Sequence, residues 1–573
     1  MVLRNSGRVG RCQLYKPVFL GARAFLFAII AISVFVVRFN QNIFYMIKTF
    51  TQKIDFSWFF LSLIGFVLVL PFSQALVSIF GGIVLGVALL EDSWKNKFKR
   101  FKENRILLFI PGIYLVYLIS FIVYYKTGSS LYDLKKALFF LVIPMAFMIG
   151  KPLSAFQKRL LFYAFAIAIF VATVVAMFNW FFKSETINFA IHKISLISHI
   201  RFSFQLILIF WFIIILVYQN HKNLPTKIKT GLLFLALYFL AFLYFQQSLT
   251  GLIAFGASLF FAVFLLIQTQ IKYRTVLLSM IFGTILIPFL YVFWIVNSFY
   301  TIEKIDKESI DLTTSLGNYY THDFENLAVE NGHYTYLFIC HDEMRNEWNK
   351  VSNIKYDDNL PNGFPLYATL TRYLTSKGLK KDAEGIKSLT PQDIQNVENG
   401  IANVIFQTRK YSLYPRIYQT VWEYYMYSIT GDPSYQSFSQ RIEFAKAAIT
   451  IIKNNFWFGV GAGNWKEEFK KAYTTSNSKL DQELYASSHN QYLNYMVKFG
   501  FIGLLIVMFF IVYPVIKTKS YRDPLFLIFL VFLFFANFAD SNFETHMGSS
   551  FFLFFYCLFV LHNDNSYLIL SDK

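Results

Sequence analysis

Long apolar runs, separated by short polar segments, make up most of the chain. They occupy residues 57–298 and 493–562, and one long polar segment lies between them. A helix needs about 20 apolar residues, with a range of about 17 to 25, to cross a membrane. On this basis the runs predict twelve membrane helices, several of them short, over residues 57–70, 75–91, 105–124, 137–149, 160–182, 202–218, 231–245, 251–269, 276–298, 493–516, 524–540 and 550–562.

Among the loops that join these runs, those rich in basic residues alternate with those that have none. Lys and Arg gather in WKNKFKRFKENR (94–105) and in four later loops, whereas the intervening loops PFSQ, QQSLT and SNFETHMGS contain neither. Positively charged loops tend to stay in the cytoplasm. The predicted domains are therefore 46–298 with helices 1–9, an outer segment 299–490, and 491–573 with helices 10–12 and a short cytoplasmic tail.

The first 45 residues do not fit this pattern. Residues 19–37 are apolar enough to span a membrane, but a helix there would leave the four basic residues that precede it outside, against the charge bias. Met46 begins MIKTFTQKIDFSWFF, which is typical of a cytoplasmic start. We expect Met46 to be the functional start or residues 1–45 to be a dispensable leader. A cleaved signal peptide is disfavoured because no small-residue cleavage site follows the apolar run.

The outer segment is expected to fold as a small, mainly helical domain. It contains four tryptophans and many tyrosines, and the turn signals LPNGFP and TGDPS divide it. Within residues 442–452 the helical period places Ile442, Ala445 and Ile452 on one face, with Ala448 or Ile449 between them. This face is the predicted packing surface of that helix.

Composition agrees with a membrane protein. Of the 573 residues 56% are hydrophobic, 69 are Phe, 36 are Tyr, and only 15% are charged. A soluble protein with so few charged residues could not keep so many apolar side chains away from water. The net charge of +19 would suggest nucleic acid binding in a soluble protein, but many of these basic residues lie in short loops, where they meet anionic membrane lipids. The fold class predicted is an all-α polytopic membrane protein, and no nucleic acid partner is expected.

The stretch 456–505 holds the groups most suited to chemistry. Gly459, Gly461 and Gly463 form a glycine turn, His489 and Asn490 follow, and an apolar helix then begins. Reactive groups at a boundary between water and membrane favour chemistry on a lipid-linked substrate.

Several stretches together resemble the O-antigen ligase and polymerase superfamily. The resemblance covers nearly all of the chain from Met46 and rests on the order of the motifs around one outer segment. The motifs are RIEFAKAAITIIKNNFWFGVGAGNW (441–465), SSHNQYL (487–493), FGFIGLL (499–505), HIRFS (199–203), ENGHYTYLFICHDEMRNEW (330–348), TRYLTSKGLKKDAEG (371–385), GIAN (400–403) and SNFETHMGSSFF (541–552). One departure is QSLTG (247–251), where Leu249 stands in place of the family's usual Arg.

The resemblance implies a bundle like that of the GT-C glycosyltransferases and a transfer reaction at the periplasmic face of the bacterial inner membrane. The implied donor is a glycan on undecaprenyl pyrophosphate, and the implied acceptor is a hydroxyl of lipid A-core or, in related enzymes, of a protein. Members are described as metal-independent, inverting glycosyltransferases. We therefore expect no cofactor and no metal, and the outer segment contains no Asp-x-Asp or other cluster with metal-ligand spacing.

Three arginines suit the pyrophosphate that leaves in such a reaction. Charge develops on its oxygens as the sugar bond opens, and the guanidinium group binds two of them at once. Arg201 stands at an outer helix end, with His199 two residues before it; Arg441 begins the next predicted outer helix and Arg416 lies upstream. Arg201 and Arg441 are predicted to be catalytic, and His199 and Arg416 to bind substrate. An interfacial anchor is the alternative for Arg201, and solvent-facing charges are the alternative for the other two arginines.

Further substrate contacts are predicted at Gly459, Gly461, Asn490 and Glu544. A glycine lets the backbone approach an anion closely, although a plain tight turn is an equally simple role. Glu544 lies in the last short outer loop, where it would orient a sugar hydroxyl, pair with an arginine or form a structural ion pair.

His489 is the predicted general base. Ser487 or Ser488 is expected to cap the helix that enters the membrane near Leu493, which would place His489 in its first turn. The positive helix end and nearby cations disfavour the imidazolium form, so a neutral ring is left to accept a proton. Asn490 would hold the ring or a sugar. A histidine that only packs or caps is the alternative.

Other functions remain open on the sequence. A polymerase of the same superfamily, or a protein O-oligosaccharyltransferase, would use similar groups. A secondary transporter is a different class, but the chain has no internal inverted repeat, no paired broken helices and few ionisable residues within its apolar runs.

Overall fold

A computed structural model describes residues 57–124, 129–183, 194–269, 271–561 and 565–569. The leader predicted at 1–45 and the start predicted at Met46 lie outside these residues. The chain divides into two compact units. The smaller is built mainly from residues 282–440, and the larger contains the helices up to residue 281 and the chain from residue 441 onward. The predicted outer segment 299–490 is thus divided between the two units at residue 441.

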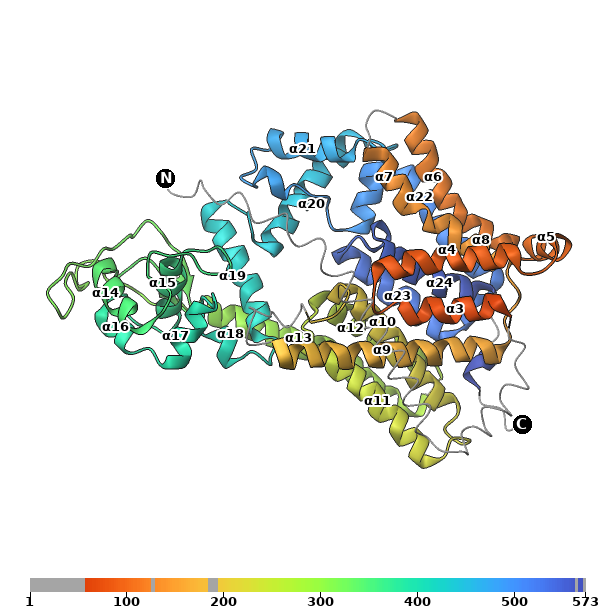
Figure 1. Cartoon of the computed structure of the whole chain (residues 1–573), viewed down its shortest axis with the longest axis horizontal. Coiled ribbons are helices and arrows are strands. Elements are labelled where there is room, and N and C mark those ends of the chain that lie inside the picture. The colour runs from red at the N-terminus through yellow and green to blue at the C-terminus, as the bar shows by residue number, and fades with distance from the viewer. Residues whose placement is uncertain (1–56, 125–128, 184–193, 270, 562–564, 570–573) are drawn as a thin grey trace. The chain divides into compact units, whose positions relative to one another are not determined.

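The predicted apolar helices are all present (Figure 1). They are α3 (Trp58–Val69), α4 (Gln74–Leu90), α6 (Phe109–Val123), α8 (Phe139–Ile149), α9 (Ala155–Lys183), α10 (His199–Gln219), α11 (Thr226–Phe245), α12 (Leu249–Thr269), α13 (Arg274–Phe299), α22 (Gln491–Thr518), α23 (Pro524–Ala539) and α24 (His546–Leu561). In the described part of the chain, seven helices have the length and composition to cross a membrane, or eight if the bent pair of α4 and α5 (Trp94–Glu103) is one span. The protein is therefore an all-α polytopic membrane protein, while the figure of twelve crossings stays a prediction.

Helix α24 forms the centre of the larger unit. All of its side chains from Met547 to Val560 are buried, and it contacts α4, α8 and α22. A helix that is apolar on every side belongs inside a bundle. Phenylalanine rings fill the space around it, as in the stacked pair of Phe66 and Phe554 with centroids 5.0 Å apart. The many phenylalanines of the chain therefore fill the interior of the bundle as well as covering its surface.

The smaller unit contains short helices and one small hairpin, in agreement with the expected helical domain. Its core is formed by buried side chains that include Trp348, Tyr373 and Leu370. Inside it, Arg372 pairs with the buried Glu330 at 2.6 Å. The elements are β1 (Val329–Glu330), β2 (His333–Tyr334), α14 (His341–Val351), α15 (Leu366–Ser376), α16 (Ala383–Lys387), α17 (Pro391–Glu398), α18 (Ile405–Thr408) and α19 (Tyr414–Thr430).

Helix α20 (Ser437–Asn454) packs through a face that matches the predicted one only in part. Phe444, Ala448 and Ile451 are buried against α21 (Trp465–Thr475), whereas Ile449 is 46% exposed. Of the residues predicted for this face, Ile452 and Ala448 are buried, whereas Ile442 and Ala445 are only half-buried. The large Phe444 ring, which meets the ring of Tyr473 in α21 edge-on, also lies on the packing face, and a prediction from aliphatic positions did not include it.

A break in α22 joins this helix to the glycine turn. Gly500 has φ 68° and ψ −172°, so the helical hydrogen bonds stop there. The carbonyls of Val497 and Lys498 accept from the N–H groups of Val460 and Gly461 at 2.8 and 2.9 Å. In return, the N–H groups that follow the break donate to the carbonyls of Phe456 and Trp457 at 2.7 and 3.2 Å. The two segments thus satisfy each other's free backbone groups.

The glycines make this approach possible. A Cβ added at Gly459 would lie 2.6 Å from the carbonyl oxygen of Val497, and one at Gly461 would lie 2.5 Å from the ring of Tyr124. Both residues also have positive φ. Close packing therefore accounts for their presence, and the substrate contact expected of them stays a prediction.

We predict that Gly500→Ala destabilises the protein by at least about 1–3 kcal/mol, the usual cost of a residue held in a backbone region that only glycine adopts readily. The added Cβ would also lie 2.3 Å from the carbonyl of Trp457. The measurement is thermal unfolding of the purified chain in detergent micelles. Gly86→Ala in α4 is the control, because nothing lies within 4 Å of its added Cβ and no loss is expected. Equal unfolding temperatures for both variants would show that glycine at this break does not contribute to the stability of the protein.

Candidate functional site

His489 lies immediately before α22 in the larger unit. The side chain of Asn490 caps this helix by accepting from the N–H groups of Tyr492 and Leu493, both at 3.0 Å. The predicted cap by Ser487 or Ser488 was therefore wrong, and so was the place of His489 in the first turn. His489 has φ 49°, in the left-handed region, and its ring lies 5.6 Å from that of Phe444. The side chain is thus turned toward α20, which covers part of the ring, and the rest stays exposed to solvent.

The surroundings favour the neutral form of this histidine. Desolvation by neighbouring residues lowers the pKa of His489 below its ordinary value of 6.5; the charge of Asp540 opposes this shift, and the charges of Arg441 and Arg201 add to it. The predicted arginines therefore act on the ring of the predicted base. The helix N-terminus next to it works in the same direction.

Arg201 is held by a carboxylate that the sequence analysis did not select. Its guanidinium pairs with Asp540 at 2.7 Å and donates to the hydroxyl of Ser198 at 3.0 Å, while its buried Nε has no hydrogen-bond partner. Asp540 directly follows α23, and its other oxygen accepts from the N–H of Ser541. An acidic residue at the end of an apolar run was the only sequence signal for this pair.

Arg441 lies in the second turn of α20 and has no carboxylate within 4 Å among the described residues. It is partly exposed and acts on the His489 ring through its charge. A guanidinium without a counter-charge can accept an anionic ligand without first releasing a protein group.

The other predicted substrate residues have different surroundings. Asn490 uses its side chain for the helix cap and for a hydrogen bond to the carbonyl of Phe538 at 3.0 Å. His199 begins α10, and its carbonyl accepts from Gln246. Arg416 belongs to the smaller unit, where it donates to Gln419 at 3.1 Å. The structure therefore brings together His489, Arg201 and Arg441, and it does not relate Arg416 to them.

Glu544 forms a buried ion pair with Lys498, not with an arginine. The distance is 2.8 Å, and the hydroxyl of Tyr117 donates to the same carboxylate at 3.0 Å. Lys498 lies 3.5 Å from a second carboxylate, Asp133 of α7 (Ser129–Ala137), which also accepts from the indole of Trp465. Lys498 and Asp133 are only 3% and 1% exposed. The structural ion pair left open for Glu544 is therefore present. Lys498 and Asp133 were not predicted, because a single Lys within an apolar run gives no sign of its partners.

The loop after α23 is fastened to the first turns of α22. Ser541 accepts from the amide of Asn494 at 2.7 Å, and the N–H of Phe543 donates to Gln491 at 2.8 Å. Together with the Lys498–Glu544 pair, these bonds fix the loop that begins with Asp540. The position of the Arg201 partner therefore depends on α22.

Among the described residues, no group of three His, Cys, Asp or Glu side chains is placed to hold a metal ion.

Residues 394–508 match the family model described as O-Antigen ligase. The matched region includes Arg416, Arg441, the glycine turn, His489 and Asn490, so the resemblance predicted from the motifs is confirmed there. Residues 394–508 therefore carry a domain of the O-antigen ligase superfamily, within a chain that is a multi-pass membrane protein. No curated protein matches the chain.

We predict that Lys498→Met destabilises the protein more than Glu544→Gln. Removing Lys498 leaves two buried carboxylates without a counter-charge, and breaking a buried pair in this way costs about 3–5 kcal/mol. Removing the charge of Glu544 still leaves the Lys498–Asp133 pair, so the loss should be smaller. Thermal unfolding in micelles measures both. Lys471→Met, which breaks the exposed pair with Glu468, is the control and should have no effect. A larger loss of stability for Glu544→Gln than for Lys498→Met would contradict the argument that Lys498 is the shared counter-charge of both carboxylates.

Proposed function

We propose that this protein is a glycosyltransferase of the O-antigen ligase type. It would move a glycan from undecaprenyl pyrophosphate to a hydroxyl of lipid A-core at the periplasmic face of the inner membrane. The observation that supports this most is the His489 ring, whose pKa is lowered and on which the charges of Arg201 and Arg441 act. A neutral base beside cations suits a reaction that deprotonates a hydroxyl and releases an anion.

In this mechanism His489 accepts the proton of the acceptor hydroxyl. The acceptor oxygen attacks the anomeric carbon of the donor sugar from the side opposite the pyrophosphate, so the configuration at that carbon inverts. The bond from the anomeric carbon to the phosphate oxygen breaks, and both its electrons leave with undecaprenyl pyrophosphate. The imidazolium later returns its proton to solvent.

The arginines would stabilise the leaving group. Arg441 has no carboxylate partner among the described residues and is the simpler anchor for the pyrophosphate. Arg201 is already paired with Asp540, so to bind phosphate it would turn one of its two N–H edges from the carboxylate to the phosphate. Its unpaired Nε supplies a further donor. The reaction is expected to need no divalent metal, because these two cations take the part that a metal plays in other transferases.

We predict that His489→Ala reduces glycan transfer by about 10²- to 10⁴-fold, the usual contribution of a general base, while donor binding is kept. Transfer is measured with purified enzyme, lipid-linked donor and lipid A-core. His221→Ala is the matched control, because this exposed histidine lies two residues beyond the opposite end of α10. In the wild type the acid limb of the rate against pH should have its midpoint below 6.5, because the neutral ring is the active form and its pKa is lowered. Near-normal transfer by His489→Ala would remove this residue from the mechanism.

The acceptor is tested by deleting the gene in its natural host. We predict that glycan then stays on its lipid carrier and is absent from lipid A-core, while protein glycosylation continues. Lipid A-core that carries single glycan units in place of long chains would instead indicate a polymerase. Loss of glycan from proteins alone would indicate a protein O-oligosaccharyltransferase.

A further inference from the structure

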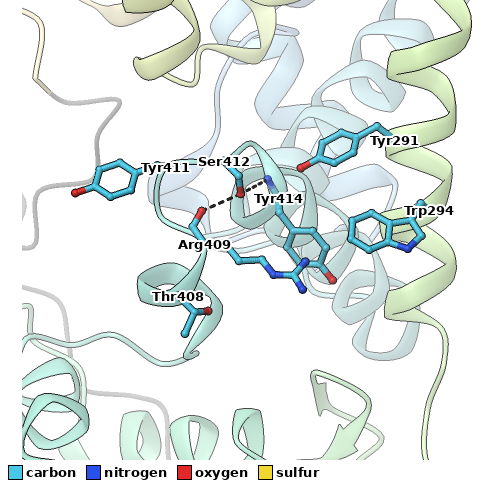
Figure 2. A pocket seen from close by; sticks show the side chains of 7 residues that line it. All are labelled: Tyr291, Trp294, Thr408, Arg409, Tyr411, Ser412 and Tyr414. Carbon is cyan, nitrogen blue, oxygen red and sulfur yellow. Dashed lines mark hydrogen bonds between the residues drawn. The ribbon is translucent and has the colours of Figure 1, made fainter.

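The smaller unit contains a cavity that the proposed transfer does not use. It has a volume of about 460 Å³ and lies between the end of α13 and the segment 408–414. Aromatic rings form much of its wall, and one guanidinium group lies among them (Figure 2). Its lining residues include Tyr291, Trp294, Arg409, Tyr411, Ser412 and Tyr414.

Arg409 is the charged group of this cavity. Its guanidinium lies 4.1 Å from the ring centroid of Tyr414 and 5.8 Å from that of Trp294. Figure 2 shows the Arg409 side chain extending toward these two rings, whereas Tyr411 points away. Among the described residues no carboxylate lies within 4 Å of Arg409. The stacked face of the guanidinium is occupied by Tyr414, and its N–H edge is left to meet an anion.

A short turn holds this arginine in place. The hydroxyl of Ser412 donates to the carbonyl of Arg409 at 2.8 Å and accepts from the N–H of Tyr414 at 3.3 Å. The Tyr414 ring packs against Trp294 with centroids 5.6 Å apart. The position of the cation is therefore built into the fold.

The cavity lies beside the end of an apolar helix. Helix α13 is one of the helices able to cross a membrane, and Trp294 stands five residues before its last residue, Phe299. At 1.5 Å per residue this is about 7–8 Å from the helix end. Trp and Tyr are enriched at this level of membrane helices, where phosphate groups of lipids are found. Trp294 is 51% exposed, so its ring is free to border a bound molecule.

We propose that this cavity binds the phosphate group of a membrane lipid, with Arg409 as its anion-binding residue and Trp294 beside the headgroup. A phosphate presents several oxygens to the N–H edge of a guanidinium, and the aromatic wall suits the less polar part of the lipid next to it. The phosphate can come from a phospholipid or from a polyprenyl phosphate. The proposal concerns binding alone and holds whether or not the chain transfers a glycan.

The test measures lipid binding to the full-length, delipidated chain in detergent micelles by native mass spectrometry. The probes are phosphatidylglycerol, undecaprenyl phosphate and monoglucosyl diacylglycerol, which has a sugar but no phosphate. Arg409→Gln should weaken the tightest binding of phosphate lipids about tenfold, because a hydrogen-bonded charge is lost. Arg409→Lys should lose less, because it keeps the charge.

Arg345→Gln is the matched control. Arg345 also lies on the smaller unit and 5.2 Å from a tyrosine ring, but it is paired with Asp342 and Asp357. Its loss should leave lipid binding unchanged. An effect of Arg409→Gln on both phosphate lipids assigns a general phosphate site, and an effect on one of them identifies the source. The proposal is overturned if Arg409→Gln binds both phosphate lipids as tightly as Arg345→Gln does. It is also overturned if Arg409→Gln weakens binding of the glucolipid as much as binding of the phosphate lipids, because the cavity would then recognise sugar.

Discussion

The need to satisfy backbone groups at the break in α22 determines much of this structure. Four polar groups are freed at Gly500 within an otherwise apolar helix, and unpaired groups of this kind cost several kcal/mol in a membrane. The segment 456–461 pairs with all four. This pairing needs glycine on both sides, and it places the first turns of α22, with His489 in front of them, against the helices α20 and α21. The glycine motif and the histidine motif are thus two parts of one connection.

Lys498 extends this connection to the rest of the site. Its carbonyl accepts from Gly461, and its side chain binds Glu544 in the loop after α23. The same loop begins with Asp540, which holds Arg201. A buried ion pair often adds little to stability compared with apolar packing, but it fixes which groups meet. Here it links the glycine turn, α22 and the partner of a candidate catalytic arginine through one residue.

The sequence predicted helices well and partners poorly. The apolar runs located all of the apolar helices because length and hydrophobicity are local properties. The motif order selected His489, Arg201 and Arg441, and the structure brings these three residues near one another. The pairing of Arg201 with Asp540 and the cluster around Lys498 depend on segments up to several hundred residues apart. The part of Phe444 in the packing face of α20 was missed for a related reason, since its ring lies against a tyrosine of another helix. Each of these features is decided by tertiary contacts.

The two arginines near His489 differ in their counter-charge, and this difference orders the events of the proposed reaction. Asp540 raises the pKa of His489 while it neutralises Arg201, so one carboxylate affects both the base and a cation. A pyrophosphate that first meets the unpaired Arg441 brings negative charge to the site without displacing Asp540. As charge develops on the leaving oxygen, Arg201 can turn from Asp540 toward it, and this interaction grows only in the transition state. The Asp540 carboxylate, once Arg201 has turned away, has the protonated ring of His489 as its new partner. Its negative charge is thus compensated by the proton that His489 takes from the acceptor.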